Sequence, residues 1–255
     1  MTTVSVTTNP TTVSVTSPTT ATVTTTSPVA SVINENQATI ATTLTNVQSI
    51  ESPNWIQFNT TAVASTGVGR MWWNDTDGTL DFGMKGGNVV QQVGQELFAL
   101  VKSSDGGARN IGEAVFITGS DGTNKLVALA QANTEPTSSK TFAIMAESIS
   151  GGSKGFCTTF GLIRGLNTNA LTEGAAVWLS PTTPGGLTST RPTQPNHAVF
   201  IGFCVRKNRN NGVIFVNIQN GYELDELHNV KITDPQDGDV LKYNAAQGLW
   251  VNGTA

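Results

Sequence analysis

Short runs of apolar residues, separated by turn residues, fill the sequence from residue 69 to residue 221. Residues 69–73 and 79–83 flank an Asn-Asp-Thr-Asp-Gly turn, and an Asp-Gly pair supplies the positive-φ positions of a tight β-hairpin. No segment of ten or more residues here follows the 3.6-residue period of a helix. The pattern therefore predicts an all-β fold. The further predicted strands are 88–93, 96–101, 114–118, 125–130, 141–146, 155–163, 175–179, 198–205 and 213–218.

The spacing of these strands predicts three parts after the N-terminal region. Residues 69–101 are expected to form a β-hairpin module, and residues 102–221 a β-sandwich or barrel domain. Residues 222–255 read as a small β tail of short strands around two turns. Because so small a sheet cannot form a hydrophobic core by itself, we expect the tail to pack on a neighbouring chain or on the main domain.

The sequence opens with an uncharged, Thr-rich region. Residues 1–28 contain three copies of one sequence motif. In each copy β-branched residues alternate, and a proline ends the run. Alternate valines share one face of a strand, and proline confines such segments to edge strands or extended structure. Residues 1–31 are therefore predicted to be an extended anchoring arm held by another protein. Its candidate contacts are Val4, Val6, Val13 and Val15.

Residues 32–68 are predicted to be a linker or stalk. Ile33, Ile40 and Val47 recur every seven residues, as in a short coiled coil. Threonine is a poor helix former, so extended structure is favoured over a helix. Both alternatives remain open at this point.

The composition argues against two classes of function, nucleic-acid binding and membrane insertion. Charged residues make up 13% of the chain, against roughly a quarter in an ordinary domain. The net charge is −4 and there is no basic stripe, so nucleic-acid binding through counterion release is not expected. No run approaches about eighteen apolar residues, so membrane insertion is not expected either.

The two cysteines lie within apolar, strand-like runs. Cys157 and Cys204 are predicted to be small buried core residues, with a disulfide between them as the alternative.

The densest acidic cluster reads as a turn. Asp75 and Asp77, with the following glycine, match three positions of a calcium loop. Trp73 would then occupy its first position and Met84 its twelfth, where oxygen ligands are required. The cluster, which includes Asp81, is predicted to be a hairpin turn without a metal.

No catalytic group can be assembled from the sequence. Glycoside cleavage needs a carboxylate pair, and the pattern does not fix the separation of any two. His197 and His228 have no second histidine or cysteine at ligand spacing. We expect a protein that is not an enzyme and has no cofactor. The carboxylates considered are Asp75, Asp81, Glu113, Glu147 and Glu173.

Two adjacent tryptophans suggest a contact between chains. Trp72 and Trp73 point to opposite faces of one strand, so one is expected to face a partner chain or, alternatively, a sugar. Leu227, Val230 and Trp250 of the tail are the other candidate oligomer contacts.

Several segments resemble one class of viral protein. The stretch from Gly69-Arg-Met-Trp-Trp through residue 96 resembles a segment of structural and tail-fibre proteins of marine and cyanobacterial phages. The Thr-Val-Ser-Val-Thr opening is similar to modules of the same proteins. Further similar stretches are 183–203, 230–235, 241–244 and 250–252.

This resemblance implies a fibre-like homotrimer in the virion, in contact with other structural proteins of the tail, neck or capsid. In such fibres the tail module is often followed by domains that touch the host, whereas this sequence ends at Ala255. We therefore expect a tail fibre or fibre-like appendage subunit that projects a β domain from an anchored arm. The alternatives are a host-surface glycan-binding adhesin and a capsid-decorating protein, such as a head fibre or cement protein.

Overall fold

The structure, a computed structural model, describes residues 13–15, 32–34, 58, 67–221 and 223–255. The chain divides into an N-terminal unit that ends at Phe58 and a second unit that begins at Asn59. In the N-terminal unit, strand β1 (Val13–Val15) pairs in parallel with β2 (Val32–Asn34). The rest of the predicted arm, and the segment on which the coiled-coil alternative depends, lie outside the described residues.

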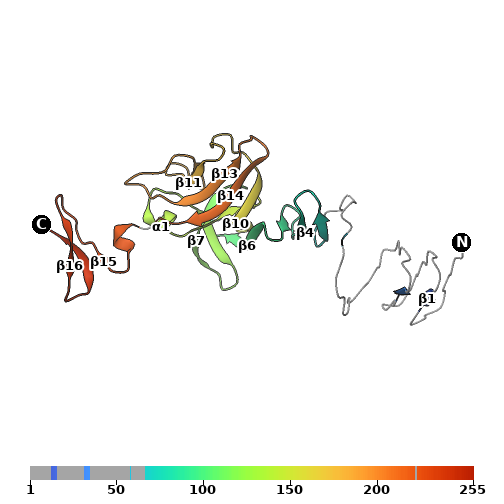
Figure 1. Ribbon diagram of the computed structural model, residues 1–255, viewed down its shortest axis with the longest axis horizontal. Coiled ribbons are helices and arrows are strands. Elements are labelled where there is room, and N and C mark those ends of the chain that lie inside the picture. Colours follow the sequence, from blue (N-terminus) through green and yellow to red (C-terminus); the bar gives the residue numbers. More distant parts are fainter. Residues whose placement is uncertain (1–12, 16–31, 35–57, 59–66, 222) are drawn as a thin grey trace. The chain divides into compact units, whose positions relative to one another are not determined.

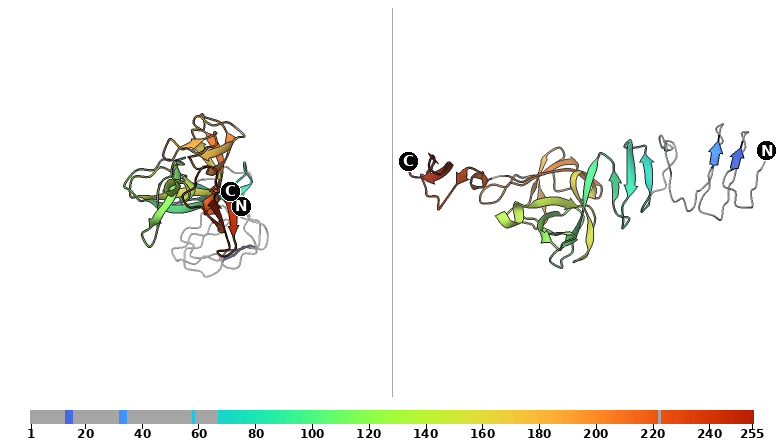
Figure 2. Two further views of the ribbon diagram at one scale, coloured as in Figure 1. Left: turned by 90° about the vertical axis from the view of Figure 1, so that its left-hand side faces the viewer. Right: turned by 90° about the horizontal axis from the view of Figure 1, so that it is seen from below.

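The first part of the predicted hairpin module, up to Gln92, forms an antiparallel sheet. Its strands are β3 (Met71–Asn74), β4 (Thr79–Gly83) and β5 (Val90–Gln92), which Figure 2 shows in blue-green. The first turn forms because the side-chain Oδ1 of Asn74 accepts the backbone N–H groups of Thr76 and Asp77, at 3.1 and 3.2 Å. Gly78 completes the turn with a φ of 68°.

The main body is a nine-stranded sheet, part of which closes into a barrel (Figure 1). Five strands follow one another in the order β10-β6-β8-β7-β9, and β9 pairs with β10 to close the ring. All of these pairs are antiparallel except β6 with β8. This confirms a barrel as the core of the predicted β domain. The strands are β6 (Glu96–Ser103), β7 (Ala114–Ser120), β8 (Lys125–Leu129), β9 (Thr141–Met145) and β10 (Lys154–Leu166).

Strand β6 belongs to the barrel rather than to the hairpin module. Its residues from Glu96 pair with β10, so the barrel begins before the boundary at residue 102 that the sequence suggested. The cause is the tight turn between β5 and β6, where the backbone N–H of Gln95 donates to the carbonyl of Gln92 at 3.2 Å. Such a turn leaves no linker between the two sheets.

Four further strands extend the sheet outward from β10 (Figure 1). Their order is β14, β13, β11 and then β12 at the edge. The sequence did not predict the two-residue strand β12 or the single turn of helix α1 (Glu135–Ser138). The four strands are β14 (Gly212–Gln219), β13 (Phe200–Arg206), β11 (Ala176–Leu179) and β12 (Leu187–Thr188).

Strand β9 is buried on both faces because it separates two cores. Ala143 and Met145 point into the barrel core, and Ile144 between them points into a second core against β11, β13 and β14. On β7, Ala114 and Val115 divide between the two cores in the same way. Successive side chains of a strand alternate between faces, so an unbroken apolar run is what a shared wall requires.

The C-terminal tail is a small separate sheet. It consists of a 3₁₀ turn (Leu224–Glu226) and the strands β15 (Val230–Lys231), β16 (Val240–Asn244) and β17 (Leu249–Gly253), shown in red in Figure 2. β17 lies between β15, to which it is parallel, and β16, to which it is antiparallel. No residue from 223 to 255 is buried.

Candidate functional site

The acidic turn has its carboxylates committed to local hydrogen bonds. The Oδ1 and Oδ2 atoms of Asp81 accept bonds from Thr79 Oγ1 at 2.8 Å and Asn74 Nδ2 at 3.0 Å. Asp75 accepts a bond from the indole Nε1 of Trp73 at 3.3 Å. The predicted hairpin turn is confirmed, and these bonds hold it in shape.

Glu147 ties the hairpin module to the barrel. Its Oε1 accepts the backbone N–H of Phe156 on β10 at 2.9 Å. Its Oε2 accepts the side-chain amide of Asn88, which precedes β5, at 3.2 Å. Because both oxygens are occupied and the residue is 8% exposed, this carboxylate has a structural position.

The other two carboxylates considered from the sequence also hold loops. The Oε1 and Oε2 atoms of Glu113 accept bonds from the side-chain amide and the backbone N–H of Asn110, at 2.9 and 2.6 Å. Glu173 accepts the backbone N–H of Lys207 at 2.7 Å. Each of the five carboxylates thus fastens a turn, a loop or a neighbouring strand.

A buried acid that the sequence did not reveal lies where β5 meets the barrel. Glu96 is 3% exposed, and its Oε1 lies 3.4 Å from both the backbone N of Gln92 and Nη1 of Arg164. In the described part of the chain, its Oε2 and the buried Oε1 of Gln92 have no hydrogen-bond partner. Burial raises the pKa of Glu96 above 4.5, while Arg164 acts in the opposite direction and Asp81 adds to the rise.

This burial predicts that Glu96→Gln raises stability at neutral pH. A folded-state pKa above the unfolded value means that the native state binds the proton more tightly. The contribution of Glu96 is therefore most favourable below pH 4.5, and it is lost as pH rises through the folded-state pKa. The neutral amide removes this loss, so we expect a higher Tm at pH 7 and a flatter dependence of Tm on pH above 4.5.

Asp237→Asn is the matched control, because it removes one negative charge from an exposed position. Thermal unfolding of both variants between pH 4 and pH 8 gives the comparison. A Tm for Glu96→Gln below that of the parent chain across this range would show that the ionised pair with Arg164 stabilises the fold.

His197 lies between two carboxylates that are distant in sequence. Its Nδ1 is 2.8 Å from Glu223 Oε1 and 3.3 Å from Glu135 Oε2. Its backbone N–H donates to the carbonyl of Ala132 at 2.9 Å. No local pattern could have shown this grouping, because the three residues are far apart in the sequence. Glu135 lies in α1, His197 in the loop before β13 and Glu223 at the start of the tail. His228 is exposed.

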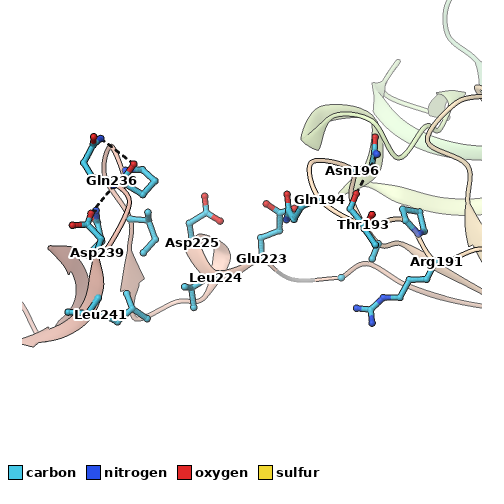
Figure 3. A pocket seen from close by; sticks show the side chains of 17 residues that line it. Arg191, Thr193, Gln194, Asn196, Glu223, Leu224, Asp225, Gln236, Asp239 and Leu241 are labelled. Atoms are coloured by element: carbon cyan, nitrogen blue, oxygen red, sulfur yellow. Dashed lines mark hydrogen bonds between the residues drawn. The ribbon is translucent and has the colours of Figure 1, made fainter. Parts of the chain in front are cut away.

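A pocket combines residues of the loop between β12 and β13 with residues of the tail (Figure 3). Its charged side chains are Arg191, Glu223, Asp225 and Asp239, and its lining includes no histidine, cysteine or serine. Asp239 accepts the backbone N–H of Gln236 and the side-chain amide of Asn252, and these bonds lower its pKa below 3.8. An ionised carboxylate held in this way shapes a turn and is a weak proton acceptor.

Both cysteines are free and buried, as predicted for core residues. They belong to different cores, Cys157 to the barrel core and Cys204 to the second core, so the disulfide alternative is wrong. Burial raises the pKa of Cys157 to about 12 and also raises the pKa of Cys204. Both thiols therefore stay protonated and unreactive at neutral pH.

The described ranges show neither a metal-binding cluster nor a membrane-spanning helix. No three His, Cys, Asp or Glu side chains there meet in an arrangement that could hold a metal ion. The described helices are all too short or too polar to span a bilayer.

The predicted partner contacts have different environments. Trp72 is 8% exposed, whereas its neighbour Trp73 is half-buried. Leu227 and Trp250 are 43% and 42% exposed, and Val230 is half-buried. Val13 and Val15 lie in β1, while Val4 and Val6 are outside the described residues. Their contacts with another chain stay predictions.

The sequence did not reveal an apolar surface feature, called the aromatic strip below. It crosses β6, β10, β14, β13 and β11, which are consecutive strands of the sheet. Rings of neighbouring strands meet edge to face, with centroids 5.3 Å apart for Phe160 and Phe215. Phe200 and Phe203, both in β13, also meet edge to face, with their ring centroids 5.2 Å apart. The strip consists of Leu97, Phe160, Phe215, Phe203, Phe200 and Trp178.

These observations define an all-β protein built on a five-stranded barrel, with an exposed aromatic surface beside it. No protein-family model matches the sequence, and no curated protein is significantly similar to it. Its surfaces and its sequence pattern are therefore the grounds for a function.

Proposed function

We propose that the chain is a structural component of a bacteriophage particle. In this proposal it is a subunit of a tail fibre or fibre-like appendage, located in the virion. Its N-terminal arm anchors it to other structural proteins of the tail, neck or capsid, and its β domain projects outward as part of a homotrimer. The segments that resemble phage fibre proteins motivate this choice of class.

The observation that carries the proposal is the sheet formed by the C-terminal tail. Leu227, Tyr243 and Trp250 are 43%, 59% and 42% exposed, and no residue of residues 223–255 is buried. Tyr243, Trp250 and Val230 are cross-strand neighbours, so they form one apolar row on one face. A small sheet needs such a face covered to be stable. Assembly with other chains would cover it.

The chemistry of the described residues supports a role without catalysis. The five carboxylates considered as acids or bases hold turns and loops, and the two thiols are buried. A catalytic site needs a nucleophile, a base and an orienting group in mutual reach. A structural role places no such demand on these residues.

A glycan-binding adhesin is the second candidate. The exposed rings of Tyr243 and Trp250, with centroids 5.6 Å apart, favour it because aromatic faces with polar tips suit sugar stacking. A capsid-decorating protein would use the same anchor at another place on the particle.

Deleting residues 2–28 is the test of the proposed anchor. The uncharged repeats alternate valine with polar residues, which suits addition to the edge of a partner's sheet. We expect the shortened protein to remain soluble and folded but to be missing from purified particles. Its amount is measured by quantitative mass spectrometry of particles assembled in a host that supplies the other virion proteins.

A full-length variant with Val4, Val6, Val13 and Val15 all changed to threonine is the matched control. It keeps the length, β-branching and neutral charge of the arm but loses the apolar face. If the apolar face docks the arm, this variant is also missing from particles. Incorporation of the shortened chain at the parent level would contradict the anchoring role.

A further inference from the structure

The aromatic strip is one continuous surface because its members are linked by cross-strand pairs and by the ring contacts of Phe160 with Phe215 and of Phe200 with Phe203. Phe160 pairs with Leu97 of β6, and Phe203 pairs with Phe215 of β14. Directly opposed residues of an antiparallel pair share a face of the sheet. At the outer end, Trp178 pairs with Phe200, and their ring centroids are 5.5 Å apart. The strip thus runs across five strands without a gap.

The strip lies open to solvent in a single chain. Leu97, Phe160 and Phe203 are 61%, 43% and 46% exposed, and the other three members are partly exposed. From the usual areas of such side chains, the exposed apolar surface is on the order of 400 Å². A standard interface buries about 800 Å² per partner, of which about 60% is apolar. The strip therefore supplies most of the apolar area that one such interface needs.

The strip carries no charge that would oppose its association with identical strips. None of the six side chains is ionisable. Charged groups lie near both ends, where Arg191 stacks over Trp178 at 5.4 Å and Arg164 pairs with Glu96 beside Leu97. The whole chain carries a net charge of only −4. Two copies can therefore approach without strong repulsion, and charged groups at the margin are typical of an interface rim.

We infer that the aromatic strip is the surface through which the barrel domain binds another copy of this chain. The inference rests on the proposed homotrimer and assigns its main contact to the barrel. The apolar core of the contact comes from the six strip residues, and the polar rim comes from the residues at its ends. In a closed trimer the strips of all three copies can meet only around the common symmetry axis, so each strip contacts the strips of both neighbours there.

The test compares masses of full-length proteins by light scattering during serial dilution. The parent chain is expected at about three times 26.7 kDa. The double variant Phe160→Thr/Phe203→Thr keeps strand propensity but loses two rings, and we expect its dissociation constant to rise by about 100-fold or more. Val68→Thr/Ile111→Thr is the control, since it changes residues 56% and 42% exposed outside the strip.

If the double variant does not fold, Leu97→Lys tests whether the strip is the contact between copies of the chain. Ile111→Lys is its control. Leu97 is the most exposed strip residue, so a lysine there is solvated in a monomer but desolvated in an assembly. Circular dichroism verifies that each variant keeps the parent fold. Dissociation of the strip variants alone supports the inference.

Three other results would overturn it. Strip variants that keep the parent mass would reject the strip as the contact and leave the homotrimer intact. A parent chain that is monomeric at micromolar concentration would reject both. Binding of the monomeric parent to a glycan array, lost in Phe160→Thr/Phe203→Thr, would reassign the strip to a carbohydrate.

Discussion

Replacing Gly161 by alanine is expected to destabilise the protein by about 3 kcal/mol or more. Gly161 lies in β10 with a φ of +97°, a conformation that side chains rarely adopt. A Cβ atom there would lie 2.0 Å from the carbonyl oxygen of Gln95 and 2.6 Å from Cα of Glu96. Both are backbone atoms where the chain enters β6, so the β6–β10 pairing itself would have to shift.

Urea and thermal unfolding of Gly161→Ala measure this effect, and Gly119→Ala is the matched control. Gly119 is also in a strand, but a Cβ atom there would meet nothing within 4 Å. We expect the control to stay within about 0.5 kcal/mol of the parent. A Gly161→Ala variant with the same midpoint as the control would show that β6 and β10 are not paired as described.

Replacing Ile144 by alanine is the second large effect, with an expected loss of about 2–5 kcal/mol. Ile144 is fully buried in the second core, and its neighbours Ala143 and Met145 are fully buried in the barrel core. The strand is thus fixed from both sides and cannot move to fill the space that the lost atoms leave. The cost should lie toward the upper part of that range.

Ile111→Ala is the same substitution at a residue that is 42% exposed, and it should cost less than about 1 kcal/mol. Equilibrium denaturation of both variants, with equal m-values, provides the comparison. Similar losses in the two variants would contradict the burial of Ile144 between the cores.

The positions of most strands could be predicted because apolar runs and turn residues are local signals. The predicted strands at 114–118, 125–130 and 141–146 correspond to β7, β8 and β9. The order of strands could not be predicted. It depends on pairings such as β6 with β10, whose partners are far apart in the sequence and are selected by packing in three dimensions.

The aromatic strip could not be predicted because its strands are apolar on both faces. Phe203 stands between Gly202 and the buried Cys204 in an unbroken apolar run, which does not reveal the exposed face. Bulges add to the difficulty. The pairing of β10 with β6 shifts register between Thr158 and Phe160, so counting by twos along β10 assigns the wrong face beyond that point.

The buried acid Glu96 also lacked a sequence signal. A glutamate at the start of a strand is ordinarily taken as solvated, and its environment here depends on Gln92 and Arg164 in two other strands. By contrast, the Asn-Asp-Thr-Asp-Gly turn was predictable because every bond that shapes it forms within a few residues.

The shared wall between the two cores has a consequence for synthesis on the ribosome. The five barrel strands are complete once Leu166 has emerged, so the barrel can close on the nascent chain. The opposite face of that wall, with Ala114 and Ile144, then stays uncovered until β14 ends at Gln219. During that interval the nascent chain exposes an apolar face to chaperones and to other nascent chains of the same polysome. Translation speed between these two points therefore sets how long each new chain exposes this apolar face before the second core is complete.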